Sequence, residues 1–210
     1  MTSIIVNAST GTYRVPGVVE TLETARCFET VPPSTVAGFL ESLCGREFGD
    51  FARSGSRVAY GETRKPAGSG KILRKDAVVT NPQGGFDEAI GNKNSQRPIF
   101  HETLYDLEYR MDIEGPYADL VTKAVKGEIP RKGVLCLGES DDLVDSVRVV
   151  EEPIETNWVV SVTRGEGQVW LPVRVWRFRD KVRPNYGTFK RVKSLTPPET
   201  AWLTPGGLAK

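Results

Sequence analysis

The amino-acid sequence predicts an α+β fold with two helices on an antiparallel sheet. Strand-like and helix-like segments alternate through residues 1–153 in the order β, α, β, long hairpin, β, α, β. From residue 154 onward the pattern is almost entirely strand-like. The first order is typical of the split βαβ, ferredoxin-like (RRM-like) sheet. We therefore expect a ferredoxin-like domain over residues 1–153, followed over residues 154–210 by a small antiparallel β extension and a tail.

Two segments have the periodicity of amphipathic helices. The first carries five apolar residues at helical spacing, which are Val36, Phe39, Leu40, Leu43 and Cys44. Pro32 and Pro33 force an extended entry into this helix, and Gly45 is a suitable end. We expect the second helix to begin at Pro116 and to end at Gly127.

Several segments have the composition of strands. They are "SIIVNASTGTYR", residues 57–62, "KGVLCLGE", which is expected to be a short buried strand, and "LVDSVRVV". Residues 17–31 are expected to be a loop or an irregular strand. In the extension, "RGEG" is expected to be a turn between two strands, and the tail "TPPETAWLTPGGLAK" to be extended and partly disordered.

A long hairpin is expected between residues 63 and 98, where glycine, proline and asparagine surround the strand-like "GKILRKDAVV". The chain then enters a central strand, "RPIFHETLYDLEYRMDI", in which apolar and polar residues alternate. The residues expected to share one face of this strand are Ile99, His101, Thr103, Tyr105, Leu107, Tyr109 and Met111.

Charge is segregated along the chain, although the net charge is only +1. Residues 174–193 contain eight Lys or Arg and one acid, whereas residues 139–155 contain seven acids and one base. Two interpretations stay open. The runs are either solvated faces, or a basic surface for nucleic-acid phosphates and an acidic surface for another protein.

The sequence offers no familiar enzyme or cofactor site. His101 is the single histidine, which excludes a histidine-based metal cluster, and "GSGK" at residues 68–71 lacks the spacing of a phosphate-binding loop. Asp141 and Asp142 are expected to be surface acids rather than a catalytic pair. We therefore expect neither metal nor cofactor.

The same sequence favours a cytoplasmic protein without a membrane span. It has three widely spaced cysteines, no basic and apolar leader at its N-terminus, and no long apolar run. The cysteines are expected to be reduced thiols.

Three segments resemble CRISPR-associated protein family five of the RAMP superfamily. "VPPSTVAGFLESLCGR" (residues 31–46) is similar to the proline-rich entry and first helix of that family. "GVLCLGESDDLVDSVRV" (residues 133–149) is similar to its Leu-Gly-x-Ser strand and turn with the strand that follows. "RPIFHETLYDLEYRM" stands where the family returns from its long hairpin. In this order the three segments cover most of residues 1–150.

The resemblance implies a structural subunit at the foot of a type I Cascade complex, which defends cells against viruses and other foreign DNA. Such a subunit has a thumb hairpin, binds the 5′ handle of the crRNA, and contacts the first backbone (family seven) subunit and the large subunit. Target DNA is met only through the complex. Some members also cut precursor crRNA with a Tyr and an adjacent Lys and His, but here Phe100 precedes His101.

The candidate RNA-binding residues follow from charge, position and shape, and each has an architectural alternative. The thumb cations, suited to phosphates or to solubility, are Lys71, Arg74, Lys75, Lys93 and Arg97. Ser34 and Thr35 are suited to a phosphate at a helix start or to plain N-capping. Tyr13 and Arg14 end the first strand, where the tyrosine either stacks a base or packs in the core. In residues 174–193 arginines interleave with Trp176 and Phe178, which suits an interface or a core strand.

Three functions stay open at this point. The first is a non-catalytic RNA-binding scaffold. The second is a metal-independent endoribonuclease, in which His101, Lys93 and Tyr105 form the catalytic set and the histidine acts as general acid or base; alternatively, His101 only stacks or hydrogen-bonds. The third is a protein–protein adaptor without RNA contact.

Overall fold

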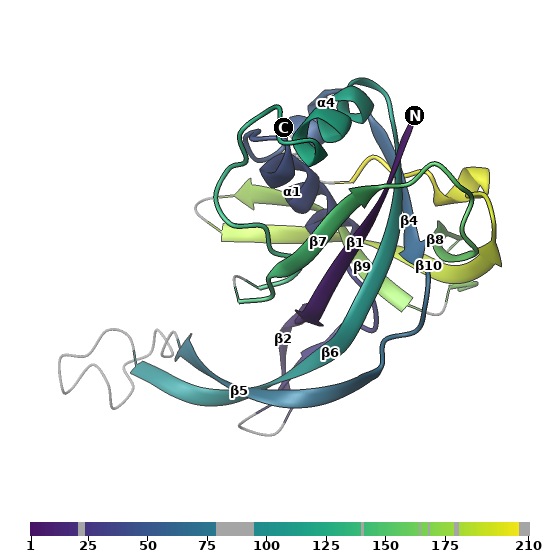
Figure 1. Cartoon of the computed structure of the whole chain (residues 1–210). Helices are drawn as coiled ribbons and strands as arrows, with labels where there is room; N and C mark the ends of the chain where they lie inside the picture. Colours follow the sequence, from purple (N-terminus) through teal and green to yellow (C-terminus); the bar gives the residue numbers. More distant parts are fainter. Residues whose placement is uncertain are drawn as a thin grey trace.

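The structure is a computed structural model that describes residues 1–20, 24–78, 95–139, 141–163, 165–167, 169–178 and 181–205 (Figure 1). It is a sheet-rich α+β structure in which a mixed sheet curls around the core. The α+β class expected from the sequence is therefore confirmed, although the sheet also contains a parallel pair, β3 (Thr24–Cys27) with β6 (Ser95–Glu114).

Four strands form the centre of the sheet in the spatial order β7-β1-β6-β4, with every neighbouring pair antiparallel. Helix α1 follows β1 in the chain, and helix α4 follows β6. The elements are β1 (Thr2–Gly11), α1 (Pro33–Leu43), β4 (Arg57–Glu62), β6 (Ser95–Glu114), α4 (Pro116–Val125) and β7 (Val144–Val149). The predicted helices and these four strands are confirmed with small offsets: Pro33 is already the first helical residue, and β1 ends at Gly11 instead of Arg14.

Both helices contribute to one main apolar core. The five residues of the predicted stripe in the first helix, from Val36 to Cys44, are all buried, and so is Tyr117 of α4. Leu107, Tyr109 and Met111 on β6 are buried as well. The face assigned to this strand from its alternation therefore meets the core.

Three further strands extend the sheet in the order β4-β8-β10-β9. They are β8 (Thr156–Ser161), β9 (Val169–Phe178) and β10 (Lys181–Ser194). Leu171 of β9 and Phe189 of β10 belong to the same buried cluster as α1, because the sheet curls over that helix. The expected antiparallel extension is present, but "RGEG" does not close a hairpin: β8 and β9, on either side of it, each pair with β10.

A buried ion pair joins the central strand to the extension. Arg110 and Asp112 of β6 form two hydrogen bonds, from Nε to Oδ1 at 2.8 Å and from Nη2 to Oδ2 at 2.9 Å. Arg110 Nη1 also donates to the carbonyls of Ile154 at 3.0 Å and Leu195 at 3.2 Å. Its guanidinium lies 5.2 Å from the ring centre of Trp158. The carbonyls just before β8 and just after β10 therefore both bind the buried guanidinium of Arg110, whose charge is balanced by Asp112.

One expectation about local structure is wrong, and two others are met in part. Residues 17–31 contain most of β2 (Arg14–Glu20) and all of β3, and the pairing of these strands shifts register between Arg14 and Val19, as expected of an irregular strand. "KGVLCLGE" is not a strand: it forms one isolated bridge, between Cys136 and Leu143. Of the tail, residues 196–205 are described, and they form the 3-10 turn η2 (Glu199–Ala201) and a bridge between Leu203 and Val58; residues 206–210, on which the expected disorder partly falls, lie outside the described residues. A short helix, α2 (Asp50–Arg53), was not expected.

Asp142 corrects another expectation, because it is fully buried instead of lying on the surface. Its carboxylate accepts the backbone N–H groups of Thr12 at 2.8 Å and Glu139 at 2.9 Å. It also accepts the hydroxyls of Thr10 at 3.0 Å and Thr12 at 3.3 Å. Gly138, at φ +146°, stands so close that a Cβ there would lie 2.6 Å from Asp142 Oδ2. The aspartate therefore fastens the turn before β7 to the end of β1.

We expect Asp142→Ala to lower the free energy of unfolding by about 3 kcal/mol, because it leaves several buried donors without their acceptor. Its exposed neighbour provides the matched control: Asp141→Ala is expected to change that free energy by less than about 0.5 kcal/mol. Urea unfolding followed by circular dichroism measures both. Equal effects of the two substitutions would contradict the assigned role.

Candidate nucleic-acid interface

The predicted long hairpin is present and projects from the body of the protein (Figure 1). Strand β5 (Gly68–Val78) pairs antiparallel with the first half of β6, from Gly68 opposite Tyr105 to Val78 opposite Ser95. Residues 79–94, which include Lys93, lie outside the described residues. The described part of the hairpin is a continuous two-stranded arm.

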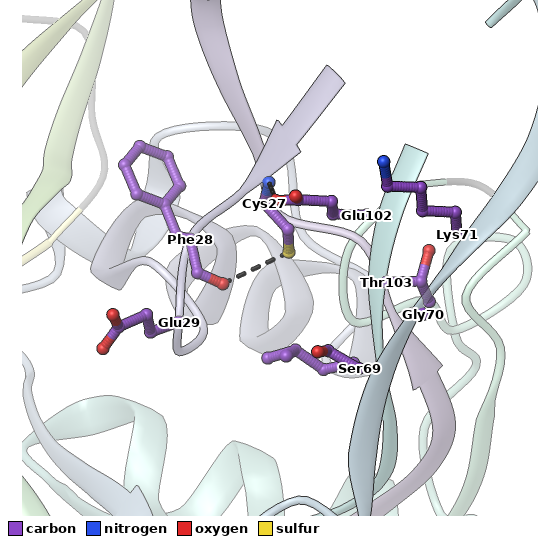
Figure 2. A pocket seen from close by; sticks show the side chains of 9 residues that line it. Cys27, Phe28, Glu29, Ser69, Gly70, Lys71, Glu102 and Thr103 are labelled. Carbon is purple, nitrogen blue, oxygen red and sulfur yellow. Dashed lines mark hydrogen bonds between the residues drawn. The ribbon is translucent and has the colours of Figure 1, made fainter. Parts of the chain in front are cut away.

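A pocket of about 300 Å³ lies at the base of this arm. Three chain segments line it: the end of β3 with the residues after it, the first residues of β5, and the middle of β6 (Figure 2). The lining residues are Cys27, Phe28, Glu29, Ser69, Gly70, Lys71, Glu102, Thr103 and Leu104. This volume is at the small end of the range for ligand pockets and is suited to one flat ring system.

The pocket combines apolar walls with both signs of charge. Phe28 and Leu104 supply apolar surface, and Lys71 is exposed on β5. The Glu102 carboxylate accepts the backbone N–H of Cys27 at 3.3 Å, which directs it along the pocket wall. Gly70 leaves room for the Tyr105 ring, since a Cβ at residue 70 would lie 2.8 Å from that ring. The arrangement offers a cation, an acceptor and an apolar contact within one small space.

Cys27 is held in the pocket wall by its own hydrogen bonds. Its thiol donates to the carbonyl of Phe28 at 3.2 Å (Figure 2). The thiol also accepts the N–H of Tyr13 at 3.1 Å. The pKa of this thiol is raised to about 11, chiefly by burial; the N–H of Tyr13 opposes the rise, and the carboxylates of Asp142 and Glu102 add to it. Cys27 is therefore a neutral thiol near pH 7.

Four of the five predicted thumb cations have their backbone on this arm, and the fifth, Lys93, lies outside the described residues. Lys71 lines the pocket, and the backbone register places Arg74 opposite Ile99, Lys75 opposite Pro98, and Arg97 opposite Asp76. The side chains of Arg74, Lys75 and Arg97 lie outside the described part of the structure. Their backbone positions follow one another outward from the pocket.

His101 does not face the pocket. It is 0% exposed, and its Nδ1 lies 3.6 Å from Glu139 Oε1, on the core side of β6. Tyr105 is half-buried beside Gly70, and Lys93 is outside the described residues. In this conformation a phosphodiester has no access to the imidazole.

The start of α1 is built by prolines and tyrosines. Pro32 is the N-cap residue, no side chain caps the helix, and the N–H of Thr35 donates to the carbonyl of Pro32 at 3.0 Å. N-capping by Ser34 or Thr35 is therefore wrong, and a phosphate contact there stays a prediction. The entry is fixed through Val31, whose carbonyl accepts the Tyr60 hydroxyl at 2.9 Å and whose N–H donates to the Tyr109 hydroxyl at 3.3 Å.

Tyr13 and Arg14 lie beside the pocket but differ in exposure. Tyr13 is 3% exposed and belongs to the main core, so core packing is the alternative that the structure favours for its ring. Arg14 is exposed at the start of β2, with its backbone opposite Cys27. Of the two, only the arginine is accessible to a ligand in this conformation.

Sequence reasoning missed most of the pocket lining. Phe28 and Glu29 lie just after β3. They reach the pocket because β3 pairs in parallel with β6 at Phe100 and His101, and a pairing between such distant segments cannot be recognised from the local sequence. One signal was present: Gly70 and Tyr105 are a strand glycine and an aromatic residue at nearly opposite positions, a combination typical of a ring that covers a glycine.

Two further findings apply to the described residues only. Their His, Cys, Asp and Glu side chains form no group of three or more that could hold a metal ion. None of their helices has the length and apolar content that crossing a membrane requires.

Comparison with known proteins identifies this fold in CRISPR systems. No family model matches the sequence, and no curated protein matches it. Among solved structures, a chain of a "CRISPR RNA-guided surveillance complex" superposes with a TM-score of 0.62 at 12% identity, covering 94% of this chain and 92% of that one. The protein therefore shares its fold, over nearly its whole length, with a chain of such a complex.

Two other solved structures match with lower scores. A "Cas protein" has a TM-score of 0.46 at 12% identity, with 91% of this chain and 94% of that chain covered. A "CRISPR protein from Archaeoglobus fulgidus" has a TM-score of 0.37 at 14% identity, with 96% and 89% covered.

The raised pKa of Cys27 predicts slow alkylation. At pH 8 we expect iodoacetamide to modify Cys27 about 100-fold more slowly than in the urea-unfolded chain, because thiolate is the reactive form. The rate should still rise with pH above 9. Peptide mass spectrometry measures the rate at this one cysteine, and equal rates in the folded and unfolded chain would contradict the assignment.

Proposed function

We propose that this chain is the structural subunit that binds the 5′ handle of the crRNA in a type I CRISPR Cascade surveillance complex. The observation that carries the proposal is the pocket at the base of the projecting hairpin, with Lys71, Phe28 and Glu102 around one nucleotide-sized space. The fold shared with a chain of a surveillance complex supports it.

The finer fold assignment is part of the proposal. The strand order β7-β1-β6-β4, with α1 after β1 and α4 after β6, supports a ferredoxin-like RAMP domain of CRISPR-associated family five. The hairpin of β5 and β6 is then the thumb. The partners are the crRNA handle, the backbone (family seven) subunit and the large subunit, and the complex works in the cytoplasm.

The pocket chemistry suits a single nucleotide turned out of a strand. Proteins that read RNA by sequence favour unstacked bases held on apolar or aromatic surfaces. In this pocket Phe28 and Leu104 would contact the base, and the Glu102 carboxylate would accept from its amino or imino groups. Lys71, followed along the arm by Arg74 and Lys75, would meet the phosphates on either side.

We further propose that the protein binds RNA without cutting it. The burial of His101 and the presence of Phe100 where cutting members have a lysine both support this role. The endoribonuclease is the second candidate, and it requires β6 to turn His101 out of the core.

Changing Lys71, Arg74 and Lys75 together to Ala is expected to weaken binding of handle RNA and to leave the melting temperature unchanged. Loss of three phosphate contacts should also reduce the slope of log affinity against log salt by about 2. Filter binding at several salt concentrations measures both. The charge-matched control changes the exposed Lys123, Lys126 and Arg131, beyond the arm, to Ala. Equal losses in the two variants would mean that only net charge matters.

Incubation with precursor crRNA in EDTA tests the non-catalytic role. We expect no cleavage at the handle by the wild-type protein, because His101, the candidate general acid or base, is buried and does not line the pocket. Handle-specific cleavage that disappears in both His101→Ala and His101→Gln, with both variants folded by circular dichroism, would replace the scaffold with the nuclease.

A further inference from the structure

The hairpin formed by β9 and β10 has two unlike faces. Its inner face carries Leu171 and Phe189, which are buried in the main core. Its outer face carries Trp170 and Tyr186, which are 55% and 40% exposed. Two large aromatic side chains on one outer face are a feature that often marks a binding surface.

The strand register brings the two aromatic residues together. Trp170 is opposite Thr188, and Tyr186 is opposite Pro172, so Trp170 and Tyr186 are diagonal neighbours on one face. Diagonal neighbours in an antiparallel pair lie about 7–8 Å apart. This is roughly twice the 3.4 Å spacing of stacked bases. The spacing fits one base held between the rings or two successive bases laid over them.

A hollow of about 230 Å³ accompanies the pair. Trp170, Tyr186, Gly187 and Thr188 line it. Gly187 is required on the inner side, because a Cβ there would lie 2.8 Å from Val173 Cγ2 and 2.9 Å from the Phe189 ring. The β10 backbone therefore packs closely against the core at Gly187 and forms part of the wall of the hollow.

The sequence of these two strands is rich in basic residues, which suits a polyanion. Residues 174–193 carry eight Lys or Arg and one acid, and the side chains of residues 174–184 lie outside the described part of the structure. Lys190 continues the outer face beyond Tyr186 and Thr188, about 13 Å from the tyrosine along the strand. It is exposed and lines a second hollow, of about 550 Å³, which Glu166 also lines. Arg191 forms ion pairs with Glu29 and Glu62, and Lys193 forms one with Glu155. These two residues are therefore not counted as cations available to a polyanion.

This face is separate from the pocket at the hairpin base. The pocket is built on β3, β5 and β6, whereas the aromatic pair lies on β9 and β10, with β4 and β8 between them in the sheet. The pocket at the hairpin base and the hollow beside Trp170 and Tyr186 share no lining residue.

We propose that the outer face of β9 and β10 is a second binding site, for single-stranded nucleic acid of any sequence. Bases stack on Trp170 and Tyr186, and Lys190 contacts a backbone phosphate. Stacking on aromatic residues beside a basic track is the usual means of binding single strands without sequence preference. The exposed Lys190 and the excess of basic residues in the sequence of β9 and β10 favour a nucleic acid over a protein as the occupant.

The test uses the full chain in the background where Lys71, Arg74 and Lys75 are Ala, so that the thumb does not contribute. The probes are fluorescein-labelled (rU)12 and (dT)12, neither of which contains a handle. Fluorescence anisotropy should show binding of at least one probe. Trp170→Ala with Tyr186→Ala should weaken it about 10-fold or more, and Lys190→Ala should weaken it less and reduce the salt dependence.

The matched control removes exposed apolar side chains elsewhere, with Phe48→Ala and Leu195→Ala, and should leave the affinity unchanged. Absence of binding to both probes, or equal affinity in the aromatic double variant and its parent, would overturn the proposal and leave a protein as the occupant. Handle RNA binding by the chain with an intact thumb is measured in parallel. Its loss alone would count against the proposed function and leave this second site standing.

Discussion

The structure depends on one long strand that belongs both to the core sheet and to the projecting arm. Strand β6 has 20 residues; its second half pairs with β1 and β4 in the core, and its first half pairs with β5 in the arm. The core register therefore sets the direction of the arm. A slip by one residue would exchange the faces, expelling His101 and Leu107 and burying Glu102. The pocket exists only because this register is held.

Two buried acids hold the register where apolar packing alone would leave it less specific. Asp112 neutralises Arg110, whose remaining donors bind the carbonyls at both ends of the C-terminal extension. Asp142 fastens the turn before β7 to the end of β1, and the hydroxyl of Thr12 in turn meets that of Thr103 on β6 at 2.9 Å. A buried charge without its partners is costly, so each network favours one arrangement of distant segments over all others. The two networks thereby tie β6, from which the arm projects, to β1 and to the C-terminal extension.

Most of the fold and part of the candidate site were predictable from residue patterns. Helical spacing identified α1 and α4, and alternation assigned the buried face of β6. The basic residues of the arm were found from composition, and Lys71 does line the pocket. Phe28 and Glu102 were missed, because they meet only through the parallel pairing of β3 with β6, which joins segments far apart in the chain. Asp142 looked like any surface acid, since its partners lie about 130 residues away.

The sequence by itself determined which segments are helices and strands and which of their faces are apolar, because those properties repeat every 3.6 or 2 residues along the chain. Only the tertiary structure decided that "KGVLCLGE" is not a strand, that the tail packs on β4, and that His101 is buried while Trp170 is exposed. It also decided where a pocket forms. The physical reason is that burial, hydrogen-bond partners and hollows are properties of residues brought together from distant positions, and no local pattern records them.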